Sequence, residues 1–380
     1  MGGARLILIA GLFSLVEDAS AQEIIPVVGR RECVQQPCCP PARMIGPDGK
    51  PVQPDMTAVP PATDAFAQAG EGGTAPAASF QPGFFGDFLG ISGTRALQGI
   101  DTFPIPVLRV PSAALSGGVK ISDGESPRPQ DRVYYLYNDY TDVGARINTG
   151  PFAQSFQVFR HLIGVEKTFL QGDVSLGLRL PFVLVTGAPG FEDNEFADMS
   201  IIAKYAIINN RETGGVLSTG IVVTVPTGQG FTVDLASPFF NGITGSNPTT
   251  IIESRIQPFV GWIHPLTPNL YSQGFTSVII PTDPRDVTIF CFDTALGYYL
   301  YRNPADRFVQ ALVPMLELHT NTPLDKGPNS IPIGFGEQAN LTTGAYVLLP
   351  RSVAGFATCV PLVGPKPYSM EYTVYCQLWF

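Results

Sequence analysis

Residues 174–182 read VSLGLRLPF, and this stretch decides the fold. Its apolar positions are Val174, Leu176, Leu178, Leu180 and Phe182, and Ser175, Gly177 and Arg179 alternate with them. Successive side chains of a β-strand point to opposite faces, so the stretch predicts a strand with one apolar face and one polar face in contact with water. The strands of a soluble β-sandwich alternate in the same way, so further observations must decide between a sandwich and a membrane barrel.

The composition favours the membrane barrel. Of the 380 residues, 44% are hydrophobic and only 14% are charged, which is few for a soluble protein. After Val16 no uninterrupted apolar stretch reaches the roughly 20 residues of a transmembrane helix. A β-barrel accounts for a high apolar content without a transmembrane helix, because each strand needs only about 9 to 11 residues and is apolar on one face. The net charge of −9 argues against nucleic acid as a partner.

The N-terminus carries the features of a signal peptide. Arg5 precedes the apolar run 6–16, and the small residues 19–21 suit a signal peptidase. We therefore expect residues 1–21 to be removed by cleavage before Gln22. A membrane anchor is the weaker alternative, because the run is too short to cross about 30 Å of hydrocarbon.

Residues 22–83 are rich in Pro, Ala, Gly and Gln and show no periodic apolar face. This composition predicts a disordered periplasmic linker. Six cysteines are present, of which Cys33, Cys38 and Cys39 lie in the linker and can pair in the oxidising periplasm, whereas Cys291, Cys359 and Cys376 lie on expected strands. The residues before Cys33 do not form a lipobox, so we expect no lipid anchor. Because no spacing resembles a zinc site, we expect no metal and no cofactor.

Residues 84–131 regain aromatic side chains but show no clean strand pattern. They follow a flexible linker and precede the first expected strand, so the chain can fold them back into the mouth of the barrel as a plug. Packing under the barrel rim or at the membrane interface is the alternative. The candidate plug residues are Phe84, Phe85, Phe88 and Leu89.

From Arg132 to Phe380, turn residues recur between runs of strand length. The pattern predicts an all-β fold, a transmembrane antiparallel β-barrel of about 12 strands with a proline-rich N-terminal extension. The expected strands are 132–142, 157–169, 172–184, 196–208, 215–227, 251–264, 270–281, 287–301, 308–319, 339–349, 353–363 and 368–380. Their connections largely alternate short and long, with long outer loops at 144–155, 228–250 and 320–338. Bacterial barrels show this asymmetry, and a sandwich has no reason to do so.

The last expected strand ends the chain in Phe and carries apolar residues at alternate positions before it. This pattern resembles the signal read by the barrel-assembly machinery of Gram-negative-type cells. The matching residues are Tyr372, Val374, Leu378 and Phe380, whereas Cys376 is smaller than the residue usual at its position. The resemblance implies insertion into the outer membrane, with that machinery and outer-membrane lipids as partners.

A wider resemblance covers about residues 132–380. Residues 172–177 (GDVSLG), 225–228 (VPTG) and 257–261 (QPFVG) are similar to strand ends and turns of the transporters linked to the meta-pathway of phenol degradation, which are related to long-chain fatty-acid transporters. The resemblance implies passage of small apolar or aromatic molecules across the outer membrane. It does not cover the proline-rich N-terminal part.

Alternation also proposes which polar residues face the lumen. These are Arg160, Glu166, Arg179, Asp198, Lys204, Asp293, Glu317, His319, Glu371 and Gln377. Barrels of about 8 strands fill with side chains and those of about 16 leave an aqueous channel, so 12 strands predict a narrow, partly occupied lumen. Both signs of charge are present. The set is therefore either an ion-pair network that satisfies buried polar groups or a ring that selects solutes.

Two other functions remain open. An outer-membrane hydrolase would need a nucleophile beside an imidazole and an acid. Glu317 and His319 share one strand face, but no nucleophile motif accompanies them, so we expect no enzyme activity and no catalytic residue. A structural or adhesive barrel without transport is the other alternative, because the linker could touch peptidoglycan or a periplasmic partner.

Overall fold

The structure is a computed structural model that describes residues 82–87, 93–97, 108–111, 120–146, 155–188, 191–228, 254–284, 286–327, 333–364 and 366–380. The chain divides into two units, Met1–Ala69 and Gly70–Phe380, and every described residue belongs to the second. The expected signal peptide and nearly all of the expected linker, with its three cysteines, lie outside the described residues. Within the described ranges, no helix has the length and apolar character needed to cross a membrane.

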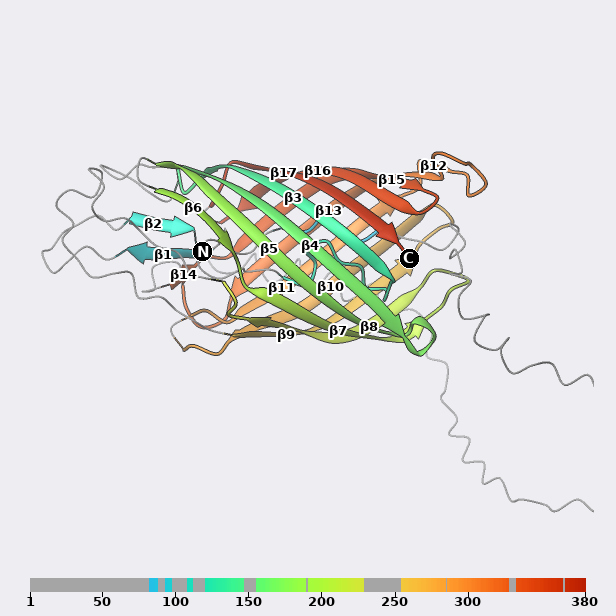
Figure 1. Cartoon of the computed structure of the whole chain (residues 1–380), viewed down its shortest axis with the longest axis horizontal. Helices are drawn as coiled ribbons and strands as arrows, with labels where there is room; N and C mark the ends of the chain where they lie inside the picture. Colours follow the sequence, from blue (N-terminus) through green and yellow to red (C-terminus); the bar gives the residue numbers. More distant parts are fainter. Residues whose placement is uncertain are drawn as a thin grey trace, which may run out of the picture. The chain divides into compact units, whose positions relative to one another are not determined.

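Twelve antiparallel strands form a closed barrel, and their order around it follows the chain (Figure 1). Closure occurs where the last strand pairs with the first. The strands are β3 (Arg132–Val143), β4 (Phe156–Phe169), β5 (Val174–Ala188), β7 (Met199–Asn209), β8 (Val216–Val225), β9 (Arg255–Pro265), β10 (Leu270–Pro281), β11 (Ile289–Tyr298), β13 (Ala311–Pro323), β15 (Gln338–Leu349), β16 (Ser352–Val363) and β17 (Met370–Trp379). The predicted fold class is confirmed.

Each of the twelve expected strands corresponds to one wall strand, and the expected strand 270–281 has the bounds of β10. Two strands extend four residues beyond their expected ends, β5 to Ala188 and β13 to Pro323. The extension of β5 pairs with a short extra strand, β6 (Phe191–Phe196), and that of β13 pairs with β11. Backbone pairing therefore continues past the positions where the apolar alternation stops.

A small separate sheet was not expected from the sequence. It contains β1 (Gly93–Leu97), β2 (Leu108–Pro111) and β14 (Ile333–Phe335), in the order β14-β1-β2. Residues 84–131 were expected to hold no clean strand, and β1 and β2 contradict this expectation. Residues 320–338 were expected to form a loop, and β14 interrupts it. The three strands have five, four and three residues, too few for an alternating pattern to be recognised. A two-residue strand, β12 (Tyr301–Arg302), was missed for the same reason.

The two ends of the barrel differ. Arg132 at the start of β3 lies opposite Trp379 at the end of β17, so the chain enters and leaves the wall at the same end. We call this the short-turn end, because it holds compact connections such as η3 (Leu170–Gly172) between β4 and β5. Gly172 adopts φ of +86° there, a conformation that favours glycine. The opposite, long-loop end holds the connections that precede β4, β9 and β15.

The alternation predicted for residues 174–182 is confirmed. Leu176 and Leu180 are exposed on the outer surface, whereas Ser175 and Arg179 are buried. Other exposed apolar side chains on the wall strands include Val133, Ile163, Val165, Ile201, Tyr205, Ile221, Ile256, Val260, Ile280, Leu296, Leu316 and Phe356. An outer surface of this kind suits the hydrocarbon core of a membrane.

The four residues of the expected assembly signal also face outward. Tyr372, Val374, Leu378 and Phe380 are exposed, so β17 and the residue that follows it present an apolar face to the surroundings of the barrel. Their role in assembly stays a prediction. Cys376 shares this exposed face, whereas Cys291 and Cys359 are buried, and all three described thiols are free.

Closure leaves the wall without a free strand edge, so the barrel should resist SDS until it is boiled. We expect unheated and boiled samples of the purified protein to migrate differently on gels. Identical migration, together with recovery from the soluble periplasmic fraction, would contradict a membrane barrel.

Deletion of Phe380 should lower the amount of folded protein in the outer membrane, because the closing strand loses its terminal exposed ring. Phe308→Ala is the matched control, since Phe308 is also an exposed ring but lies in the connection between β12 and β13. Outer-membrane yields measured over a range of expression levels should fall for the deletion alone. Equal yields for both variants and the parent would remove the role assigned to Phe380.

Candidate functional site

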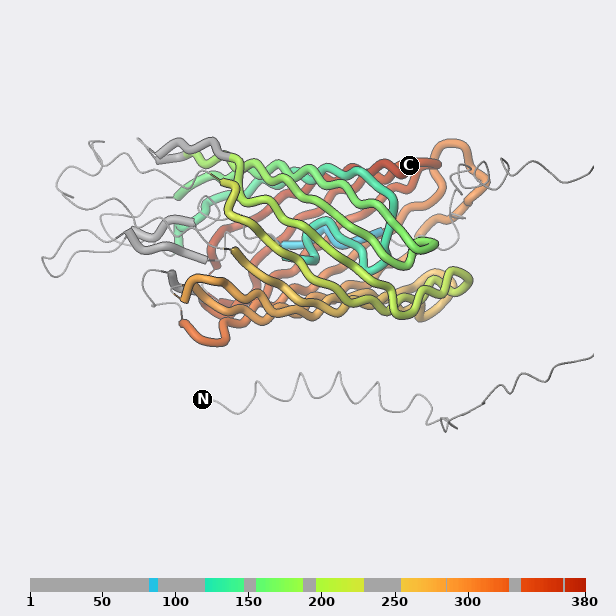
Figure 2. Tube along the Cα trace, turned by 60° about the horizontal axis from the view of Figure 1, so that its bottom comes forward, coloured from blue at the N-terminus to red at the C-terminus, as the bar shows by residue number. Residues whose placement is uncertain are grey.

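Part of the N-terminal extension lies inside the barrel. Figure 2 shows residues 82–87, in blue, and the chain leading into β3 enclosed by the wall strands. Both Phe84 and Phe85 are completely buried, as is Ile121. We call residues 82–87 and 120–131 together the lumen segment. Of the candidate plug residues, Phe84 and Phe85 are thus placed in the lumen, and Phe88 and Leu89 lie outside the described residues.

The two parts of the lumen segment pack directly on each other. The N–H of Phe84 donates to the carbonyl oxygen of Glu125 at 2.8 Å. Gly86 has φ of +86°, and a Cβ built on it would lie 2.8 Å from Cα of Asp123. Glycine is therefore required at this position both for the backbone conformation and for the close approach of the two chains.

Between these two parts, the chain reaches the long-loop end. Strand β1 pairs with β14, which lies in the connection between β13 and β15. Afterwards the chain returns, and Arg128 near its end donates to Asn209 and to the carbonyl oxygen of Gly214 at the short-turn end. The described parts of the N-terminal extension therefore lie both in the lumen, at 82–87 and 120–131, and at the long-loop end, where β1 pairs with β14.

A group of basic side chains on neighbouring strands receives one carboxylate of the lumen segment. Arg132, Arg160, Arg179 and Lys204, on β3, β4, β5 and β7, form what we call the basic wall. Glu125 ion-pairs with three of them, at 2.5 Å to Arg132, 3.0 Å to Lys204 and 3.3 Å to Arg179. Glu166 of β4 lies between Arg132 at 2.8 Å and Lys204 at 3.0 Å, so it holds two of the cations in place.

A second carboxylate of the lumen segment meets the remaining cation of the basic wall. The two oxygens of Asp123 accept hydrogen bonds from the two terminal nitrogens of Arg160, at 2.5 and 2.7 Å. Such a bidentate pair fixes direction as well as distance. Asn138 accepts two further hydrogen bonds from Arg160 and donates to Glu371 at 2.6 Å, which extends the network to β17.

The opposite side of the lumen is acidic. Asp293 of β11 and Glu317 of β13 flank His319, at 2.9 Å from its Nδ1 and 3.1 Å from its Nε2. Lys120 of the lumen segment ion-pairs with Asp293 at 2.6 Å and with Asp87. The Glu317 carboxylate also accepts the backbone N–H groups of Phe85 and Gly86, at 2.8 and 3.0 Å.

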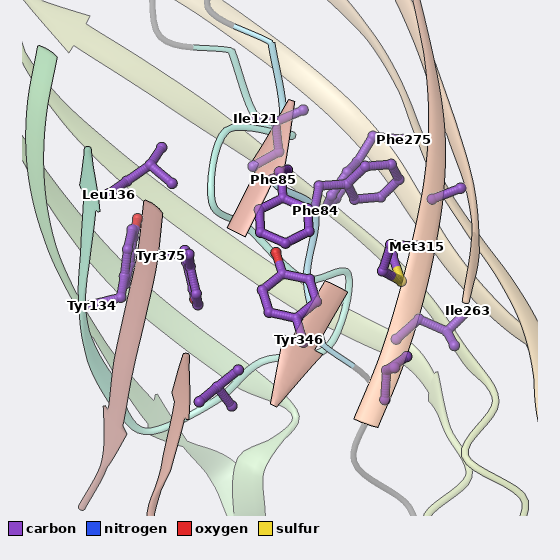
Figure 3. Packing of buried hydrophobic residues seen from close by; sticks show 14 of the residues in the cluster. Phe84, Phe85, Ile121, Tyr134, Leu136, Ile263, Phe275, Met315, Tyr346 and Tyr375 are labelled. Atoms are coloured by element: carbon purple, nitrogen blue, oxygen red, sulfur yellow. The ribbon is translucent and has the colours of Figure 1, made fainter. Parts of the chain in front are cut away.

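Aromatic side chains complete the contact between wall and lumen segment. The ring of Phe85 stacks on Tyr346 with centroids 4.0 Å apart, and the ring of Phe84 lies 5.6 Å from that of Phe275 (Figure 3). Tyr375 of β17 packs edge-on against Tyr346 at 5.6 Å. The lumen segment is therefore held by ring contacts as well as by charge.

All ten residues expected to face the lumen are buried. Eight of them contact the lumen segment, namely Arg160, Glu166, Arg179, Lys204, Asp293, Glu317, His319 and Gln377. Glu371 contacts the wall strand β3 instead. Asp198 lies just before β7 and accepts the N–H of Gly228, so it belongs to the long-loop end.

Sequence reasoning missed the groups on the lumen segment itself. The fully buried charged ones are Asp87, Lys120, Asp123 and Glu125. No strand or helix periodicity identifies them, because this part of the chain forms no regular element and is held in place by its contacts with the wall strands. It also missed Arg132, although β3 begins there, because both faces of β3 carry polar and aromatic residues.

No protein-family model and no curated protein matches the chain. Solved structures do resemble it. An outer membrane channel from Pseudomonas putida F1 has 12% identity and a TM-score of 0.48, covering 69% of this chain and 100% of its own. The KdgM porin has 8% identity and a TM-score of 0.39, and the match covers 66% of this chain and 99% of the porin. The NanC porin has 9% identity and a TM-score of 0.39, and the match covers 66% of this chain and 100% of the porin.

These identities are low and all three TM-scores are below 0.5, so these solved structures assign no function to this chain. The resemblance to the transporters linked to phenol degradation is not confirmed by any of these comparisons.

The arrangement around His319 does not suit a hydrolase. Both ring nitrogens are engaged by carboxylates, Nδ1 by Asp293 and Nε2 by Glu317, so neither is positioned on a hydroxyl or thiol nucleophile. Asp87, Asp293 and His319 also offer three ligand-type atoms within 4.8 Å of one another. Lys120 ion-pairs with both of these carboxylates, so the cluster already contains a cation.

Asp123→Asn should destabilise the protein strongly, because it leaves Arg160 without its bidentate carboxylate inside the lumen. Breaking a buried ion pair costs about 3–5 kcal/mol, whereas a surface pair contributes about 0–1 kcal/mol. Lys167→Gln is the control, because Lys167 pairs with Asp131 at 3.2 Å but is 53% exposed. We expect the free energy of unfolding in urea to fall by about 3 kcal/mol or more for Asp123→Asn and by less than about 1 kcal/mol for the control. Equal losses would contradict the account of the lumen.

Proposed function

We propose that the chain is an outer-membrane channel for small solutes, apolar or aromatic compounds in particular, and that the lumen segment is its plug. The observation that carries the proposal is the content of the lumen. It is filled by the lumen segment as well as by side chains of the wall strands. A barrel whose only role was to be a rigid wall could fill its interior from its own strands.

The same proposal includes the route to the membrane. Residues 1–21 would direct export, and the barrel-assembly machinery would recognise the exposed residues of β17 that end at Phe380. The outer membrane is then the site of action, with its lipids against the exposed apolar surface. Orientation follows from the convention of bacterial barrels, which puts the short-turn end in the periplasm and the long-loop end outside.

Two features support small aromatic or apolar cargo. The ring contacts of Phe84 and Phe85 supply an aromatic lining where the plug meets the wall. The resemblance of residues 172–177, 225–228 and 257–261 to the transporters linked to phenol degradation implies the same class. Because 12 strands enclose a narrow lumen, a large polar solute would not pass even with the plug displaced.

A structural or adhesive barrel remains the competing proposal. The buried ion pairs of Asp123 and Glu125 favour it to the extent that they hold the lumen segment permanently in place. The two proposals differ in one respect, because only the channel must conduct when the segment is removed.

Deletion of Phe84 to Leu89 should raise single-channel conductance in planar bilayers several-fold and speed uptake of phenol-sized compounds by cells. The deletion removes the ring contacts and the backbone donors to Glu317, while every wall strand remains. Replacement of the same six residues by a Gly/Ser stretch of equal length is the control for shortening, and it should open the channel too.

Folding of each variant is checked by the mobility difference between unheated and boiled samples. Equal conductance and uptake in parent and both variants, with folding intact, would refute the plug. No difference in uptake between cells with and without the whole protein would refute the channel.

A further inference from the structure

The wall contains a slot with the thickness of an aromatic ring. Gly344 on β15 and Gly355 on β16 carry no Cβ, and a Cβ built on either would lie 2.8 Å from the ring of Phe85. Gly355 lies opposite Tyr346 in the register of the two strands, so the Tyr346 ring can lie flat over it. The Phe85 ring is parallel to that of Tyr346 within 4° (Figure 3). We call these two glycines and Tyr346 the ring slot, and Phe85 occupies it.

The carboxylate of Asp123 lies beside Gly86, the residue that follows Phe85. Gly86 follows Phe85 and packs against Cα of Asp123, whose carboxylate is held by Arg160. Within the lumen segment, the residue that fills the slot and the residue that meets the basic wall are therefore linked through Gly86. They come from positions far apart in the sequence, brought together only by the folded segment.

The charges favour an anion in the second position. If the lumen segment moves aside, Asp293 loses its ion pair with Lys120, but Asp293 and Glu317 still have His319 between them. The basic wall, in contrast, loses the carboxylates of Asp123 and Glu125. Cations in a confined lumen need a counter-charge. Only a solute with an anionic group would therefore replace the carboxylates that the basic wall loses.

We infer that the solute is an aromatic carboxylate, whose ring enters the ring slot in place of Phe85 and whose carboxylate takes the place of Asp123 on Arg160. The inference rests on the proposed channel and names its substrate class. The lumen segment occupies the site as an internal ligand of the same chemistry, so binding of the solute and withdrawal of the segment are coupled. A neutral phenol satisfies only the ring slot, and an aliphatic acid satisfies only the basic wall.

Variants of the full chain in lipid nanodiscs test the site directly, with phenylacetate and 3-phenylpropionate as probes. Phe85→Ala empties the ring slot, so calorimetric titration should show at least one probe binding this variant at least tenfold more tightly than the parent. Phe84→Ala is the matched control, because it removes a ring of equal size that lies near Phe275 and not on Tyr346. Benzyl alcohol and acetate, which each lack one of the two groups, should bind Phe85→Ala at least tenfold more weakly than the better probe.

A chemical rescue provides the second test. The double variant F85A/D123A lacks both groups, and the better probe should raise its urea midpoint more than an equal concentration of acetate or benzyl alcohol does. Empty nanodiscs correct for partitioning of the probes. Equal binding of acetate and the aromatic acids, or equal gains for Phe84→Ala and Phe85→Ala, would overturn the site. If F85A/D123A does not fold, the Phe85→Ala titration alone decides.

The two proposals can fail separately. Raised conductance in the deletion of Phe84 to Leu89, without any preference for aromatic carboxylates, would leave the channel and overturn the inferred substrate class. Tenfold tighter binding by Phe85→Ala, without conductance in that deletion, would support the binding site and remove the channel.

Discussion

Neutralisation of buried charge is the constraint on which the rest of the structure depends. The basic wall places four cations inside a barrel whose outer surface is apolar, and isolated charges in such surroundings cost several kcal/mol each. Asp123 and Glu125 of the lumen segment supply the nearby counter-charges, together with Glu166 of the wall. On the other side, Lys120 does the same for Asp293. The lumen segment is thus part of the barrel's interior, and the wall is built to hold it.

The path of the chain follows from this constraint. Residues 82–87 contact the acidic side of the lumen, and residues 120–131 contact both sides. The two parts contact each other through Gly86 and Glu125. Between them the chain pairs with β14 at the long-loop end, which gives the segment an anchor outside the lumen. Displacement of the plug therefore requires that buried ion pairs be exchanged for others, and a solute with a carboxylate can provide them.

The barrel could be predicted from the sequence because each wall strand obeys a local rule. Alternation such as that of Leu176 and Arg179 sets which side chain faces outward, and neighbouring strands repeat the rule. The inward polar residues followed from the same period. Their partners did not, because Asp123 and Glu125 sit in a part of the chain without period, and only the closed barrel brings them beside Arg160 and Lys204.

The central claim is that residues 82–87 are bonded inside the lumen, and hydrogen exchange of their backbone amides tests it most directly. The N–H groups of Phe84, Phe85 and Gly86 all donate to buried oxygens, so the folded protein in lipid should protect them for as long as amides of the wall strands. Exchange of these three amides at the rate of an unstructured peptide, while the wall strands stay protected, would contradict the account.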